Sequence, residues 1–192
     1  MSILFGHYMP DEGRIRVAGA DLPPGRPRAA IHAGIGMVHQ HFSLAPNLTV
    51  LENVMTGTEK LWSLRSETGR ARAKLAALAE RFGLVVDPDA RLGDLSVGEQ
   101  QRVEILKALY NDARILILDE PTAVLTNLEA ETLFVTLKEM ARQGLSLIFI
   151  SHKLDEVMAS LANYYQWEAQ IKTSVKNAIL YPSVLVMMLA VV

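Results

Sequence analysis

Two adjacent acids at the end of an apolar run are the residues of this sequence best suited to metal and water chemistry. The aliphatic run Ile115–Leu118 is followed directly by Asp119, Glu120 and Pro121. Such a run predicts a strand buried on both faces in a parallel sheet, and ligands bind at the carboxyl ends of such strands. Asp119 is suited there to hold a hydrated Mg²⁺, and Glu120 to orient or deprotonate a water. A strand that ends in solvated acids is the plainer alternative.

Two further polar residues follow predicted buried strands. The segment GIGMVH (34–39) ends in Gln40, whose amide suits a Mg²⁺ ion or an attacking water. The segment LSLIFI (145–150) is followed by Ser151 and His152. A lone histidine is more often structural than catalytic, but at the same edge as the two acids His152 is placed to contact a phosphate.

A third candidate is the segment LSVGEQQR (95–102), which precedes a helical pattern. Ser96, with Glu99 three residues later, predicts a capping box at a helix start. Helix N-termini expose N–H groups with a partial positive charge, which favours phosphate, and Gly98 allows a ligand to approach the backbone closely. An ordinary well-capped helix is the alternative, and the capping box alone would explain it.

The elements that must position these residues are those of an α/β fold. Strands are expected at 14–19, 34–39, 115–118 and 145–150, and helices at 28–33, from 49 onward, at 71–82, from 96 onward and at 128–143. Buried strands that alternate with helices indicate a parallel sheet.

Composition narrows the class of protein. The chain has 192 residues, of which 50% are hydrophobic and 21% charged, as in a globular domain with a real core. A formal net charge of −2 gives no indication of nucleic-acid binding. The lack of cysteine excludes disulfides and thiolate metal sites. The first residues lack the basic and apolar pattern of a signal peptide.

The order of these motifs resembles that of the ATP-binding cassette (ABC) transporter ATPases. Gln40, LSVGEQQR, ILILDEPT (115–122) and IFISHK (148–153) follow one another at compatible spacing. The segments GMVHQHFSLAPNLTVLEN (36–53) and DEPTAVLT (119–126) are most similar to the importers of simple sugars or nucleosides. The resemblance covers residues 1–159 and implies a P-loop NTPase-like (RecA-like) parallel sheet with a helical signature subdomain at about 50–112.

The resemblance also implies a role for each matching residue. Gln40 resembles the glutamine that senses Mg²⁺ and the γ-phosphate, Asp119 the aspartate that supports Mg²⁺, Glu120 the general base and His152 the switch histidine. The implied cofactors are ATP and Mg²⁺.

Ser96, Gly98 and Gln100 resemble the signature motif, which acts on ATP held by the other subunit. The segment 123–126 stands in place of the dimer-contacting loop and lacks its usual aspartate. The implied partners are therefore a second ATPase domain and transmembrane permease subunits. The resemblance implies a peripheral location for the chain, at the cytoplasmic face of the plasma membrane.

The sequence departs from the family pattern at the phosphate-binding loop. No glycine is followed by lysine, so G-x-x-x-x-G-K-[ST] is nowhere present. By resemblance, residues 1–9 would lie just after that motif. We therefore expect a domain truncated at both ends, without one central strand, and inactive in ATP hydrolysis by itself although its family is enzymatic.

A second departure begins near residue 160. Residues 160–192 resemble the inner-membrane platform proteins of type II secretion and type IV pili, through a Tyr-Pro pair at 181–182 and a basic helix before it. We expect an amphipathic and then hydrophobic helical segment. The apolar stretch 179–192 is a possible truncated membrane span or anchor at the membrane surface, and a hydrophobic helix packed on the domain is the alternative.

Two functions therefore remain open on sequence alone. The first is an ATP-binding and ATP-hydrolysing subunit of an ABC importer of simple sugars or nucleosides, here truncated. The second is a non-catalytic, membrane-associated fragment or fusion related to a secretion or pilus platform protein.

Overall fold

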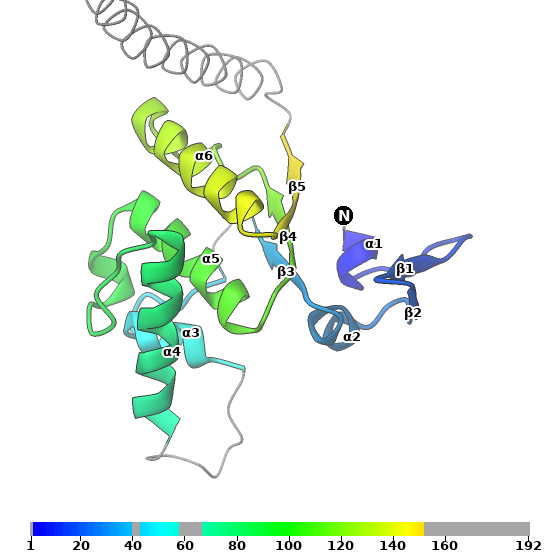
Figure 1. The fold of residues 1–192 in the computed structure, drawn as a ribbon, viewed down its shortest axis with the longest axis horizontal. Coiled ribbons are helices and arrows are strands. Elements are labelled where there is room, and N and C mark those ends of the chain that lie inside the picture. Colours follow the sequence, from blue (N-terminus) through cyan, green and yellow to red (C-terminus); the bar gives the residue numbers. More distant parts are fainter. Residues whose placement is uncertain (1, 40–42, 58–66, 152–192) are drawn as a thin grey trace, which may run out of the picture. The chain divides into compact units, whose positions relative to one another are not determined.

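Three parallel strands form the centre of the computed structural model, which describes residues 2–39, 43–57 and 67–151 (Figure 1). Strands β3 (Ile35–Val38), β4 (Ile115–Asp119) and β5 (Ser146–Ile150) lie in the order β3-β4-β5. Both strand pairs are parallel. The expected α/β fold with a parallel sheet is therefore confirmed within the described residues, which fall in one compact unit ending at Ser151.

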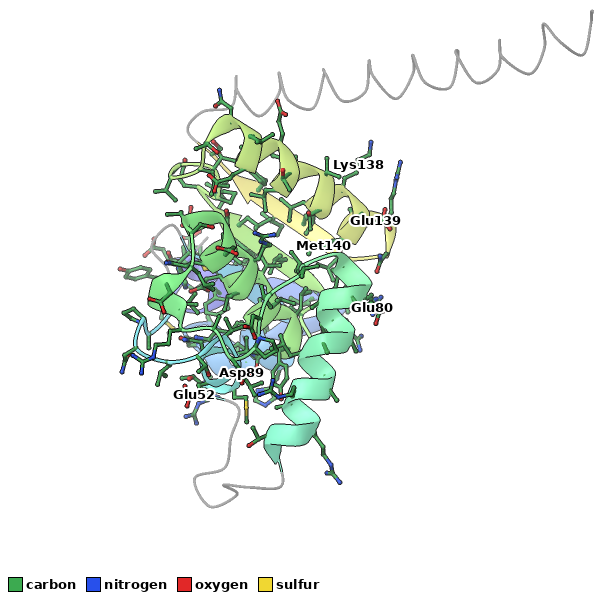
Figure 2. All side chains as sticks on the ribbon, turned by 90° about the vertical axis from the view of Figure 1, so that its left-hand side faces the viewer. Glu52, Glu80, Asp89, Lys138, Glu139 and Met140 are labelled. Atoms are coloured by element: carbon green, nitrogen blue, oxygen red, sulfur yellow. The ribbon has the colours of Figure 1, made fainter. Side chains whose placement is uncertain are left out.

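Four helices enclose the larger core on one face of this sheet. They are α3 (Val50–Met55), α4 (Glu67–Phe82), α5 (Val97–Tyr110) and α6 (Asn127–Arg142), and a 3-10 turn, η1 (Leu92–Asp94), precedes α5. Helices α5 and α6 pack on the strands, and α3 and α4 pack against α5. In α6, Met140 is fully buried whereas its neighbour Glu139 is exposed (Figure 2). Helix α6 thus presents an apolar face to the core and a polar face to solvent.

The opposite face of the sheet is covered by shorter elements. These are α1 (Ser2–Phe5), the hairpin of β1 (Ile15–Val17) and β2 (Ala20–Leu22), and α2 (Pro27–His32) (Figure 1). A smaller core forms there from Leu22, Ala30, Ile35, Met37 and Ile117.

The structure corrects several expected boundaries. The first strand was expected to reach Gly19, but it ends at Val17 because Ala18 and Gly19 both adopt positive φ (49° and 84°) and form the hairpin turn. The helix expected at 71–82 already begins at Glu67. The helix expected at 128–143 spans Asn127–Arg142, because the Thr126 side chain caps its first turn.

Some predictions concern residues that the structure does not describe. Gln40, His152 and the segment 160–192 lie outside the described residues, so the predicted C-terminal hydrophobic helix and anchor stay predictions. In the described ranges, none of the helices has the length and apolar character needed to span a membrane. The helices α3, α4 and α5 fall within residues 50–112, and their status as a separate subdomain also stays a prediction.

Candidate functional site

The carboxyl ends of the three strands bring the predicted acids to one edge of the sheet. In the strand register, Val38 lies opposite Leu118 and Asp119 lies opposite Ile150. Asp119 is therefore flanked by the end of β3 on one side and the end of β5 on the other. Asp119 and Glu120 are both half-buried. This is the edge at which open α/β sheets bind ligands.

The backbone turns sharply out of the sheet at Glu120. Its N–H donates to the Ile150 carbonyl (2.9 Å), which keeps Glu120 against β5. Its φ is +50°, in the left-handed region that costs a non-glycine residue about 1–2 kcal/mol. Pro121 follows, and its carbonyl accepts a hydrogen bond from Gln101 Nε2 of α5 (2.6 Å). Strained backbone of this kind concentrates at functional sites, so the conformation of Glu120 favours a chemical role.

A histidine that the sequence analysis did not select lies beside these acids. Burial and then the neighbouring His7 lower the pKa of His39, while Asp119 raises it. The His7 and His39 rings stack with centroids 5.7 Å apart. Together these effects place the pKa of His39 below its ordinary value of 6.5, so the ring is largely uncharged at neutral pH. Its position directly after β3 is the sequence signal that could have identified it.

The predicted capping box at the start of α5 is confirmed. The Ser96 Oγ accepts from the Glu99 N–H (3.3 Å), and Glu99 Oε2 accepts from the Ser96 N–H (2.9 Å). The Ser96 N–H and then the Ser96 hydroxyl, which donates to Glu99 Oε2 (2.8 Å), lower the pKa of Glu99. Ser96 itself is exposed. The first turn of α5 therefore lies at the surface, with Ser96 at its tip.

Gln100 has a different environment from that of Ser96. Its side-chain Nε2 donates to the carbonyls of Leu95 (3.0 Å) and Leu92 (3.3 Å). The amide thus closes the η1 turn that precedes α5. Its predicted contact with a partner's ATP stays a prediction, and it would require this amide to exchange those carbonyls for phosphate.

A buried acid on α5 holds the chain just after Gln40. Glu104 is only 4% exposed, and its Oε1 accepts from the Ser43 N–H (2.6 Å). Lys107 Nζ donates to the Ser43 carbonyl (3.2 Å). Burial raises the pKa of Glu104, against the lowering effects of the Ser43 N–H and Lys107. The sequence analysis did not select Glu104, although its place between Val103 and Ile105 marks an acid within an apolar stretch of α5.

A cavity of about 710 Å³ lies elsewhere in the molecule, lined by residues that precede β3 and β4, Gly34 and Arg114 among them, and by Lys74 of α4. It is at the amino ends of the strands, away from the acids. Its Lys74 Nζ is bonded to the Tyr110 carbonyl (2.7 Å) and to Asp112 (2.9 Å), which closes the end of α5. The geometry therefore favours the strand-end edge as the candidate site.

The strand-end edge suits a hydrated Mg²⁺ ion better than a metal ion held entirely by protein ligands. Within the described ranges, no three His, Asp or Glu side chains come together as a complete protein-made metal site. A hydrated Mg²⁺ needs only one or two carboxylates, with waters and substrate phosphates as its other ligands. The half-buried Asp119 fits this requirement.

A profile of the ABC transporter family matches residues 1–123. The nucleoside import ATP-binding protein NupA of Lactococcus lactis is 48% identical over 159 residues, which are 83% of this chain and 31% of that protein. The glucose import ATP-binding protein TsgD13 of Haloferax volcanii is 46% identical over 187 residues, covering 83% of this chain and 34% of that protein. The chain therefore spans about a third of the length of these curated relatives.

Solved structures agree with these matches. The ADP conformation of MJ1267, an ATP-binding cassette of an ABC transporter, superposes with a TM-score of 0.71 at 27% identity and covers 83% of this chain and 66% of its own. The dimeric MJ0796, a bacterial ABC transporter cassette, gives a TM-score of 0.63 at 25% identity, with 81% and 69% covered.

Proposed function

We propose a function for this chain on a premise that these matches establish: it belongs to the ABC transporter family. The chain is part of an ATP-binding subunit that drives the import of simple sugars or nucleosides. The observation that carries this function is the pair Asp119 and Glu120 at the carboxyl end of β4, with the strained backbone at Glu120. The names of the two relatives, a nucleoside import and a glucose import ATP-binding protein, support the substrate class.

The acids divide the chemistry between them. Asp119 supports a hydrated Mg²⁺, which would neutralise the charge of the ATP phosphates. Glu120 orients the attacking water and accepts its proton. Gln40 and His152, both outside the described residues, complete this arrangement in our proposal as contacts to Mg²⁺ and the γ-phosphate.

The start of α5 acts on a second ATPase domain in this proposal. Ser96 is exposed at the tip of the helix, where N–H groups and the helix dipole favour phosphate. We place Ser96, Gly98 and Gln100 against ATP held by that domain, and the dimeric state of the MJ0796 cassette supports the arrangement. The assembly would work with transmembrane permease subunits, at the cytoplasmic face of the membrane.

The phosphate contacts of a P-loop come from outside these 192 residues in our proposal. The sequence contains no glycine followed by lysine, whereas P-loop backbone N–H groups and lysine provide most contacts to the phosphates. Loss of a single donor to a transition state lowers rates by about 10²–10³-fold. We therefore expect the chain by itself to show no measurable ATP hydrolysis.

A hybrid protein tests the function. A cassette segment that contains a G-x-x-x-x-G-K-[ST] loop would be joined ahead of this chain, and ATP binding and phosphate release would be measured. We expect Mg²⁺-dependent hydrolysis, which Glu120→Gln lowers by about 10²-fold or more while ATP binding persists, because the amide keeps the shape but not the base.

The matched control is Glu131→Gln, which changes an exposed acid on α6 and should leave the rate unchanged. An active hybrid whose rate survives Glu120→Gln would refute the proposed role of Glu120. A correctly folded hybrid that binds no ATP would refute the function itself.

A further inference from the structure

In the part of the chain that the structure describes, three helices begin with the same hydrogen-bonded cap, which allows one to be compared with the others. The pairs are Thr49 and Glu52 of α3, Ser96 and Glu99 of α5, and Thr126 and Glu129 of α6. In each pair one glutamate oxygen, Oε2, accepts from the cap residue's backbone N–H at 2.8–2.9 Å. The same oxygen accepts from its hydroxyl at 2.8–3.0 Å.

Glu129 differs from the other two glutamates in what its second oxygen meets. A methyl group built on Gly98 would lie 2.9 Å from Glu129 Oε1 and 3.3 Å from Cδ, closer than carbon and oxygen tolerate. Gly98 is the second residue of α5, so its N–H is among the donors that the helix itself leaves unpaired. The hydrogen bonds from Thr126 lower the pKa of Glu129, and the Gly98 N–H and Arg102 lower it further.

The Glu129 carboxylate cannot move away from Gly98 without losing other hydrogen bonds. Its Oε2 is held by the Thr126 N–H (2.9 Å) and hydroxyl (2.8 Å), so a shift away from Gly98 would break the cap of α6. Gly98, Arg102 and Glu129 also line one small cavity of about 200 Å³ between α5 and α6. The two oxygens of a single side chain therefore face the first turns of two different helices.

We propose that Glu129 is a positioning residue for the start of α5 as well as the cap of α6, and that Gly98 lacks a side chain to leave room for its carboxylate. The functional meaning rests on the proposed function, in which Ser96 and Gly98 contact a partner's ATP. Glu129 would then fix the orientation of that contact relative to the segment that follows Glu120. The hydrogen bond from Gln101 to the Pro121 carbonyl (2.6 Å) provides a second link between α5 and that segment.

In the full chain, the sign of the effect of Gly98→Ala on the Tm should depend on whether Glu129 is present. Gly98 has no positive φ, so alanine in its place should by itself favour the helix. In the presence of Glu129, Gly98→Ala should instead lower the Tm by several degrees because the methyl group displaces the carboxylate. In a Glu129→Ala background, the same Gly98→Ala change should leave the Tm unchanged or raise it.

Replacement of Glu129 by glutamine separates the roles of its two side-chain oxygens. Glutamine has one acceptor oxygen, which suffices for a capping box but cannot serve both Thr126 and the Gly98 N–H. Glu129→Gln should therefore lower the Tm more than the matched control Glu52→Gln, since the Glu52 carboxylate accepts its hydrogen bonds from Thr49 of its own cap. Comparable losses for the two changes would mean that Glu129 is only a cap.

Amide hydrogen exchange provides the decisive local measurement. In Glu129→Ala, exchange of the Gly98 N–H should accelerate at least tenfold relative to the unmodified chain. The adjacent Glu99 N–H, held by Ser96 Oγ, should be little affected and is the internal control. A double variant less stable than Glu129→Ala alone, or an unchanged Gly98 exchange rate, would overturn the proposal. None of these measurements involves nucleotide, so they stand or fail separately from the proposed function.

Discussion

The two faces of the central sheet carry hydrophobic cores of very different size. Along β4, Leu116 and Leu118 face one core and Ile117 faces the other, because successive side chains of a strand alternate. Among the described residues, the first core contains 20 buried ones beneath α3, α4, α5 and α6. The second contains five, beneath α1, α2 and the hairpin.

This difference shows where the molecule is rigid. The helices of the larger core also carry Asn53, Gln101 and Glu104, the buried polar side chains found in the described ranges. Each of the three is hydrogen-bonded to backbone. Helix α5 is therefore fixed by both apolar and polar contacts, as a helix that presents a binding surface must be.

The smaller core is less enclosed. Ile115, Ile148 and Ile150 pack against it but are only half-buried. The two acids of the candidate site lie at the end of β4, between these two environments. The larger core thus positions the site, whereas the smaller core has room to adjust.

The largest effect that follows from this comparison concerns Leu116. It is 0% exposed and lies within the larger core, so Leu116→Ala should leave a cavity that the surrounding helices cannot fill. We expect a loss of about 3–5 kcal/mol in the free energy of unfolding, measured by urea denaturation. A loss below about 2 kcal/mol would show that this core is less rigid than its packing indicates.

The neighbouring Ile117 is the matched test of the other face. It is also 0% exposed, but it belongs to the smaller core. Ile117→Ala should cost about 2–3 kcal/mol, less than Leu116→Ala, because half-buried neighbours can move into the space. If Ile117→Ala proves the more costly of the two, the distinction between a rigid and an adjustable face is wrong.

The sequence predicted the parts of the molecule that depend on local pattern. The aliphatic run before Asp119 identified β4, and the Ser96 and Glu99 spacing identified the cap of α5. The same spacing at Thr126 and Glu129 was present in the sequence but was not used, and it sets the start of α6.

The remaining features depend on contacts between residues far apart in the chain. Glu104 and Ser43 are 61 residues apart, and no local pattern predicts that a helix acid will bind that backbone N–H. Gly98 illustrates the same limit. The sequence suggested that it leaves room for a ligand, which stays a prediction, but no local pattern indicated that the Glu129 carboxylate would also lie beside it.

The smallest expected effect, a pH dependence, concerns the polar part of the larger-core side. Burial raises the pKa of Glu104 above its ordinary value of 4.5, so between that value and the raised pKa the folded state binds more protons than the unfolded state. The contribution of Glu104 to stability therefore falls as pH rises through this window.

Glu104→Gln keeps an acceptor for the Ser43 N–H but cannot ionise, so the stability of this variant relative to the unmodified chain should increase as pH rises from below 4.5 to neutral. Urea denaturation across that range measures the difference, with Glu80→Gln on the exposed face of α4 as the control (Figure 2). A difference that stays constant or decreases with pH would mean that α5 holds Ser43 without any cost from a buried charge.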